Sequence, residues 1–256
     1  MGMKKYLSVT REIIGVITAV FSAGLLLSSC LKSDDTGTGN TPAAALMAVN
    51  LAPDAGAVGF SISGNSLVSA PLAYNSYSGS YRLVFPGTRF VEAYDYYSGV
   101  SLATASNLFD TSGYYSVFLL GTTGNFENLI VEDKLDSLEG PGQAFIRYVN
   151  AIPGTENPAL TISVNGSQVL QETSGYRAVS GFRAVAPGEA MIRVSNGTTI
   201  DTSRSIILEE QNIYTILLTG LPGETGEKAV QVKYIRNGMI TEETGRSGTG
   251  ANRLIE

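Results

Sequence analysis

The feature that most constrains the fold is a stretch of seven residues that the chain contains twice. Val49–Ala55 reads VNLAPDA and Val149–Thr155 reads VNAIPGT, one hundred positions later. Each stretch predicts that a strand ends at the Asn, because the Pro that follows fixes φ and lacks the N–H that a strand ladder needs. The same offset, within one residue, relates two further pairs of segments: Ser80–Ala93 with Gly181–Val194, and Tyr115–Gly121 with Tyr214–Gly220. We therefore expect two tandem copies of one domain. A period of about one hundred residues is too long for a solenoid, whose repeats have only about 20–50 residues.

The residues around the first repeated Pro resemble a known bacterial family. Ala52–Val58 reads APDAGAV and is similar to the SPDAPAVD start of the domain of unknown function 4397. Pro86-Gly87, between two predicted strands, resembles the PPGxY segment of that family. The resemblance covers residues 45–134 and 143–236, although Gly154 replaces the family's Asp in the second copy. It implies a β-sandwich on exported bacterial proteins and no established activity.

The pattern of strand and turn signals predicts an all-β fold. About seven short apolar segments in each copy are separated by turn signals, such as Gly64-Asn65 in the first copy and Asn165-Gly166 in the second. No long helical pattern is present, so the sequence predicts two antiparallel, immunoglobulin-like β-sandwiches. Each copy has about ninety residues, which is enough for it to fold alone. The expected plan is a signal peptide at 1–29, a lipidated Cys and flexible tether at 30–44, copy one at 45–134, a linker at 135–142, copy two at 143–238 and a disordered tail at 239–256.

The first thirty residues predict export and lipid attachment. Ile13–Leu27 is an apolar segment of fifteen residues after a basic start, shorter than the roughly 20 residues of a membrane span. Leu27-Ser28-Ser29-Cys30 resembles the lipobox of bacterial lipoproteins, and Cys30 is the only cysteine in the chain. We expect Cys30 to carry the lipids that hold the protein in the outer membrane. An uncleaved membrane anchor is the alternative.

The residues after Cys30 bear on which side of the membrane the protein faces. Lys32–Asp35 reads KSDD and resembles the acidic export signal of Bacteroidetes surface lipoproteins. This resemblance predicts a lipid-anchored protein of the cell surface in a Bacteroidetes-type bacterium. If the segment is only a charged linker, the protein faces the periplasm instead.

The composition argues against several kinds of chemistry. The chain has no His, so an ordinary Ser-His or Cys-His nucleophile pair cannot form. No calcium-loop motif is present, and no cofactor or metal is expected. The Lys and Arg residues are scattered, which disfavours nucleic acid as a partner. Four acidic residues near the linker are interpreted as a solvated charge run: Glu132, Asp133, Asp136 and Glu139.

These observations predict a non-catalytic module, not an enzyme. The favoured function is a binding or spacer module of the cell envelope, and the alternative is a fimbria-like subunit assembled through strand exchange. Tyr94 and Tyr96 are predicted to face solvent in copy one, where they could bind a glycan or a protein. The reason is that Ser195 takes the place of Tyr94 in copy two. Asp136-Ser137-Leu138 resembles the O-glycosylation acceptor of Bacteroidetes, which makes Ser137 a candidate modification site.

Overall fold

The computed structural model describes residues 42–154, 157–242 and 252–255. The described residues from Pro42 onward form one compact unit. Apart from one short 3-10 turn, η1 (Gly226–Lys228), the regular structure of the described residues consists of strands, which confirms the predicted all-β class. In this part of the chain no helix is long and apolar enough to cross a bilayer.

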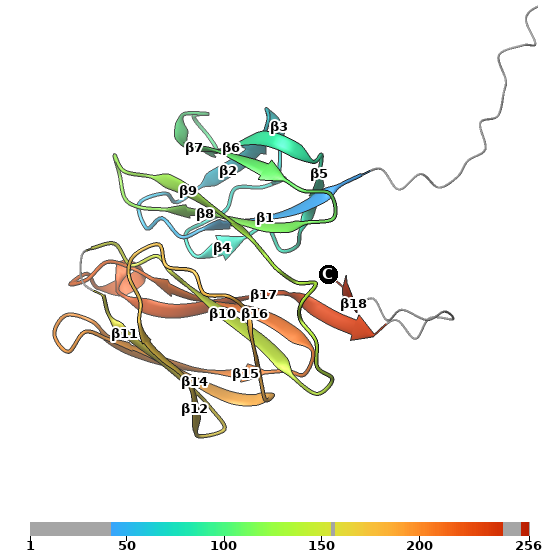
Figure 1. Ribbon diagram of the computed structural model, residues 1–256. Helices are drawn as coiled ribbons and strands as arrows, with labels where there is room; N and C mark the ends of the chain where they lie inside the picture. Colours follow the sequence, from blue (N-terminus) through green and yellow to red (C-terminus); the bar gives the residue numbers. More distant parts are fainter. Residues whose placement is uncertain (1–41, 155–156, 243–251, 256) are drawn as a thin grey trace, which may run out of the picture. The chain divides into compact units, whose positions relative to one another are not determined.

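Copy one is a sandwich of two sheets (Figure 1). Its inner sheet, which faces copy two, has the order β4-β1-β8-β9, with β5 also paired to β1. Its outer sheet has the order β3-β2-β6-β7. The strands are β1 (Ala44–Asn50), β2 (Val58–Ile62), β3 (Asn65–Ser66), β4 (Ser76–Tyr77), β5 (Arg82–Val84), β6 (Gly87–Asp95), β7 (Ser101–Phe109), β8 (Tyr114–Leu120) and β9 (Glu127–Glu132).

Copy two repeats this plan. Its inner sheet has the order β13-β10-β16-β17-β18, and its outer sheet has the order β12-β11-β14-β15. The strands are β10 (Ala144–Asn150), β11 (Ala159–Val164), β12 (Ser167–Thr173), β13 (Arg183–Val185), β14 (Gly188–Ser195), β15 (Asp201–Leu208), β16 (Asn212–Thr219), β17 (Gln231–Glu242) and β18 (Asn252–Ile255). Strands β1 and β10 end at Asn50 and Asn150, as the repeated motif predicts.

The strand pairing differs from the expected antiparallel pattern at one place in each copy. Strands β1 and β8 run parallel, and so do β10 and β16, whereas the other pairs of strands are antiparallel. In each case the partners are far apart in the sequence, so the intervening strands provide the crossover that a parallel pair requires.

Three apolar layers separate the four sheets, which follow one another in Figure 1. One layer fills each sandwich, and the third lies between the two inner sheets; we call this third layer the shared core. In β1, Leu46 faces the core of copy one while Met47 and Val49 face the shared core. Strands β1, β8, β10 and β16 are therefore covered on both faces, which accounts for their nearly continuous apolar sequences.

The chain ends differ from the expected plan in one respect. Strand β17 continues to Glu242, so residues 239–242 belong to a sheet and not to the disordered tail expected at 239–256. A short strand, β18, also pairs with β17. In the expected linker, Leu135 and Leu138 are buried in the shared core. The boundaries proposed for the two copies, 45–134 and 143–238, remain predictions.

Candidate functional site

The repeated Asn holds the loop that follows its strand. In copy one, the buried Asn50 donates from Nδ2 to the carbonyls of Ala55 (2.6 Å) and Leu72 (3.1 Å). Its Oδ1 accepts from the N–H of Ala52 (3.1 Å). Asn150 makes the corresponding bonds in copy two, both to a loop carbonyl and from a loop N–H. The amide satisfies buried backbone groups that the turn leaves without a ladder partner, so the motif has a structural role.

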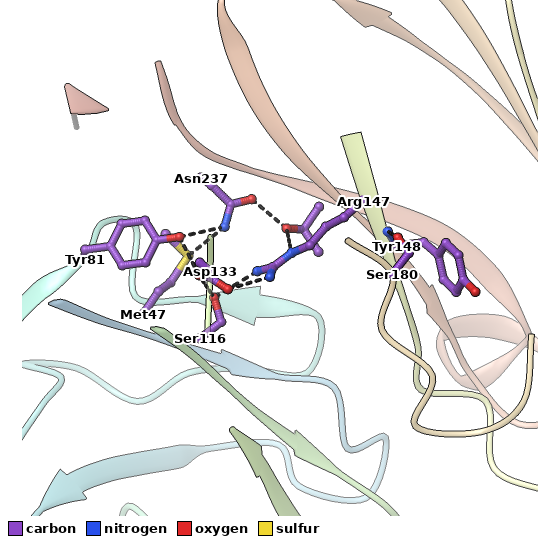
Figure 2. Close-up of polar contacts among 9 residues, drawn as sticks. Met47, Tyr81, Ser116, Asp133, Arg147, Tyr148, Ser180 and Asn237 are labelled. Atoms are coloured by element: carbon purple, nitrogen blue, oxygen red, sulfur yellow. Dashed lines mark hydrogen bonds and ion pairs between the residues drawn. The ribbon is translucent and has the colours of Figure 1, made fainter. Parts of the chain in front are cut away.

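A buried polar cluster lies within the shared core (Figure 2). At its centre Arg147 of copy two forms an ion pair with Asp133 of copy one, and both side chains are at most 1% exposed. Both copies contribute to the cluster: Met47, Tyr81, Ser116 and Asp133 come from copy one, and Arg147, Thr215 and Asn237 come from copy two.

Both charged groups of this cluster have several hydrogen-bond partners. The Asp133 carboxylate accepts from Arg147 on Oδ1, and on Oδ2 from the hydroxyls of Tyr81 (2.6 Å) and Ser116 (2.6 Å). Arg147 also donates from Nε to the Thr215 hydroxyl (2.9 Å) and from Nη2 to the Ser116 hydroxyl (3.1 Å). This degree of satisfaction is what a buried ion pair needs in order to offset the loss of hydration.

Asn237 links the two sides of the cluster. Its Oδ1 accepts from the Thr215 hydroxyl (2.6 Å), and its Nδ2 donates to the Tyr81 hydroxyl (3.2 Å). The guanidinium of Arg147 lies over the ring of Phe182, 4.4 Å from its centroid. Burial and the adjacent Asp133 carboxylate raise the pKa of Tyr81 well above its usual value, so this phenol is a neutral donor at neutral pH.

Two further ion pairs, both more exposed than the central one, also join the copies. Lys228 lies 2.6 Å from Asp54, and Arg177 lies 3.2 Å from Glu127. The hydrogen bond from Lys228, together with the backbone N–H of Thr123, lowers the pKa of Asp54. As in the central pair, the acid belongs to copy one and the base to copy two. The facing surfaces therefore have complementary charge.

The cluster is built from equivalent positions of the two copies. Met47 and Arg147 both stand three residues before the repeated Asn. The β8–β9 register pairs Tyr115 with Glu132, and the β16–β17 register pairs the equivalent Tyr214 with Arg236, so Asp133 and Asn237 each follow a matching residue. Asn237 meets Met47, and Asp133 meets Arg147. This reciprocal pattern is typical of a twofold interface, but only one of the two contacts carries charge.

The cluster corrects one expectation from the sequence. Asp133 was expected in a solvated charge run with Glu132, Asp136 and Glu139, but it is buried. The other three side chains of that run are exposed. The sequence does contain one indication that a carboxylate is buried. Arg147 interrupts the otherwise apolar strand β10, and a buried arginine needs a buried carboxylate as its partner. Since its hydrogen bonds and its ion pair run between residues of both copies, the cluster joins the copies.

On the predicted ligand face, the ring of Tyr94 packs against Gly59 of the neighbouring strand. Tyr94 lies opposite Gly59 in the β2–β6 ladder, and a Cβ placed on Gly59 would lie 2.3 Å from Cζ of the Tyr94 ring. At the matching place in copy two, Ser195 lies opposite Ala159. The large residue therefore accompanies the glycine and the small residue accompanies the alanine. This packing accounts for the difference between the copies, and a ligand role for Tyr94 and Tyr96 remains a prediction.

The other predicted site residues lie apart from this pair. Tyr96 follows the end of β6 in a turn, where its ring makes an edge contact with Tyr97 at 5.7 Å. Ser137 is exposed in the segment between the copies, and its hydroxyl donates to the carbonyl of Lys134 (3.2 Å). Cys30, the predicted lipidation site, lies outside the described residues.

One end of copy one combines a groove with exposed apolar side chains. The groove has a volume of about 650 Å³ and lies between residues 62–69 and residues 82–89. Leu83 and Phe85 line it and are 81% and 68% exposed. The register of β13 on β10 places Ala184 where copy one has Leu83. Large exposed apolar side chains at these two positions are therefore particular to copy one, and nothing in the sequence pattern had indicated them.

The four sheets and the shared core between the inner ones define a protein built from two paired β-sandwich domains. Within that class, the model of one family, described as a domain of unknown function (DUF4397), matches residues 44–157 and again residues 144–237. The chain belongs to this family and contains its domain twice. The resemblance of Ala52–Val58 to the family is thereby confirmed.

Comparison with other proteins adds no function. No curated protein sequence matches the chain significantly. Among solved structures, the Bacillus anthracis TIE protein is similar over 84% of this chain at 11% identity and a TM-score of 0.26. The chain spans about half of that protein, with 48% of it covered. A proposed cell adhesion protein from Bacteroides eggerthii is similar over 78% of this chain and 98% of its own length, at 12% identity and a TM-score of 0.25. At these TM-scores the likeness does not extend to function.

Proposed function

We propose that this protein is a non-catalytic module of the bacterial cell envelope, lipid-anchored to the outer membrane at Cys30 and facing the cell surface. Its role is to hold a binding surface away from the membrane as one compact unit. The observation that carries this proposal is the shared core, in which an apolar layer and a buried ion pair join the two copies. A pair joined in this way acts as one spacer and not as two loosely connected domains.

The anchoring part of the proposal is supported by the sequence. Cys30 is the only cysteine, it follows an apolar segment of signal-peptide length, and its context resembles a lipobox. Two acyl chains are sufficient for stable anchoring, because each buried methylene contributes about 0.8 kcal/mol.

The alternative role, a fimbria-like subunit assembled by strand exchange, is less well supported. Strand exchange requires a sandwich with a vacant strand position. Each outer sheet here has four strands, although β3 has two residues and its counterpart β12 has seven. The edge of β2 beyond β3 is occupied, because Leu67 donates to the carbonyl of Phe60, and Leu72 and Val58 exchange two backbone bonds. Two filled sandwiches favour the spacer or binding module.

The test follows the anchor and the orientation separately. Cells expressing the chain are fed radiolabelled fatty acid, and the label should appear on the parent protein and be absent from the Cys30→Ala variant. Protease added to intact cells should remove the parent protein if it faces outward. Label that persists on Cys30→Ala would overturn the anchor, and protection of the parent from protease would place it on the periplasmic side.

A further inference from the structure

The exposed apolar residues of copy one gather at one end of its sandwich. Four large apolar side chains are more than half exposed and form what we call the apolar end: Leu83, Phe85, Phe90 and Leu108. Leu83 lies in β5, and Leu108 pairs with Thr88 just after Phe85 in the sequence. The N–H of Ser63, which lines the groove, donates to the carbonyl of Phe90 in the neighbouring strand β6. Exposed apolar groups that cluster in this way usually mark a contact surface.

The chain enters copy one at this same end. Ala44, the first residue of β1, pairs with Val84 between Leu83 and Phe85. The carbonyl of Ala43 accepts from the N–H of Ser112, in the turn that follows Leu108. Thirteen residues, 31–43, separate this end from Cys30. Even if fully extended they reach about 45 Å, so a lipid on Cys30 keeps the apolar end close to a membrane.

The charge of the apolar end suits an anionic surface. Arg82 is exposed, and Arg89 donates to the carbonyls of Phe85 and Pro86. Neither arginine forms an ion pair with another described residue, and one carboxylate, Asp110, follows Leu108. The whole chain carries a net charge of −6, so this net positive end is exceptional.

Copy two provides the contrast. The same turn in copy two has Ala186 in place of Phe85 and Glu189 in place of Thr88, and Glu209 and Glu210 follow its β15. Copy two keeps an exposed arginine, Arg183, where copy one has Arg82, and Met191 and Ile207 are exposed there, but its three carboxylates make this end more acidic. The two copies share a fold, so the fold does not require Leu83, Phe85 and Arg89 at their positions.

We propose that the apolar end of copy one is a second membrane contact, with Leu83 and Phe85 entering the interfacial region of an anionic phospholipid bilayer and Arg82 lying against its phosphates. This proposal rests on the lipid anchor at Cys30 for its location. The acyl chains hold the protein at the membrane, and each apolar side chain inserted into the bilayer and each basic side chain near its surface adds to the attraction. The contact would set the orientation in which the module stands on the membrane.

The chain contains no Trp, which makes a direct test available. Phe85→Trp places a single fluorophore in the apolar end, and Ala186→Trp places one at the matching exposed position of copy two. Each variant, carrying its lipid, is reconstituted in phosphatidylcholine vesicles with phosphatidylglycerol and with brominated acyl chains. Phe85→Trp should show blue-shifted emission that the brominated lipid quenches, and Ala186→Trp should not. Equal quenching of both probes, or quenching of neither, would overturn the proposal.

A second arm separates this contact from the anchor. The chain that begins at Leu31 has no lipid, and its binding to the same vesicles is measured by cosedimentation. Leu83→Ser and Phe85→Ser should each lower the partition coefficient about tenfold, because each removes one apolar side chain that the bilayer would bury. Arg82→Gln should lower it about fivefold in anionic vesicles and leave it unchanged in neutral ones. Retention of parental binding by all three variants, with parental thermal unfolding, would refute the contact even if Cys30 is lipidated. Binding with this dependence would support it even if Cys30 proves not to be.

Discussion

At the scale of single residues, the ion pair between Arg147 and Asp133 should be costly to break from one side. Asp133→Asn leaves a buried guanidinium without its anion, and Arg147→Met leaves a buried carboxylate without its cation. Each single change should lower the free energy of unfolding by about 3–5 kcal/mol. The double variant should lose much less, because the chain already contains Met47 and Asn237 at the equivalent positions of the other copy.

Urea unfolding of the four proteins measures this coupling. Parent, single variants and double variant form a double-mutant cycle in which the two losses should not add. Losses that add within about 0.5 kcal/mol would show that Arg147 and Asp133 act independently, contrary to the contact in Figure 2. The exposed pair Arg193–Asp201 within copy two is a suitable control, because its removal should cost less than about 1 kcal/mol.

A second prediction at this scale concerns the Gly59 and Tyr94 pair. Gly59→Ala should destabilise the protein by about 1–3 kcal/mol, because the new methyl group would overlap the Tyr94 ring. Adding Tyr94→Ser should restore most of the loss, since Ala with Ser is the pair that copy two contains. Thermal unfolding monitored by circular dichroism checks both changes. A double variant no more stable than Gly59→Ala alone would contradict the packing argument.

The same pair shows what sequence reasoning could and could not reach for the site. Comparison of the copies correctly identified Tyr94 as a position where they differ. It could not identify the cause, because Gly59 lies thirty-five positions away on another strand and only the register brings the two together. Arg147 was likewise visible within an apolar strand, but its carboxylate lies in a run of acidic residues that resembles a solvated linker.

At the scale of strands and loops, the side chain of the repeated Asn should contribute substantially to the free energy of unfolding. Asn50→Ala leaves the carbonyls of Ala55 and Leu72 without their side-chain donor and should cost about 1–3 kcal/mol for each unsatisfied group. Asn50→Asp keeps the acceptor for Ala52 and loses the donors, so it should also be destabilising. Denaturant unfolding measures both losses, and an Asn50→Ala variant within about 0.5 kcal/mol of the parent would contradict this role.

The element scale is also where the sequence was most informative about the fold. The two Asn positions, the turn signals and the absence of helical periodicity were sufficient for the all-β class and for two copies. The pairing of inner sheets was not predicted, although strands such as β16 are apolar at nearly every position. Such runs indicate cover on both faces, and a lone two-sheet sandwich covers only one face of each strand.

At the scale of the whole molecule, alkaline pH should weaken the junction between the copies. Burial and the nearby carboxylate of Glu127 raise the pKa of Tyr176 to about 12, and burial raises that of Tyr81 well above its usual value. A folded-state pKa above the unfolded value of about 10 means that the stabilisation is fully present below pH 10. It is then lost as the pH rises through the folded-state value. Urea midpoints should therefore fall above about pH 10.

The matched variant for this prediction is Tyr176→Phe, which should reduce the alkaline loss. Tyrosinate absorbance followed with pH gives an independent readout, because a protected phenol ionises late or together with unfolding. The exposed Tyr97 provides the comparison through Tyr97→Phe, which should leave the alkaline dependence of the urea midpoints unchanged. A parent protein whose midpoints are flat above about pH 10 would show that these phenols do not contribute.

The reciprocal contacts between the copies have a consequence for how such a chain can be rearranged. Because Met47 meets Asn237 as Arg147 meets Asp133, exchanging the order of the copies along the gene would preserve both of these contacts. Replacing copy two by another copy one would not, since each Asp133 would then face a Met47 and two carboxylates would be buried at the junction without a cation. The junction is therefore indifferent to sequence order but not to the identity of its halves. The order of the two copies along such a chain can therefore change, but one copy can no longer take the place of the other.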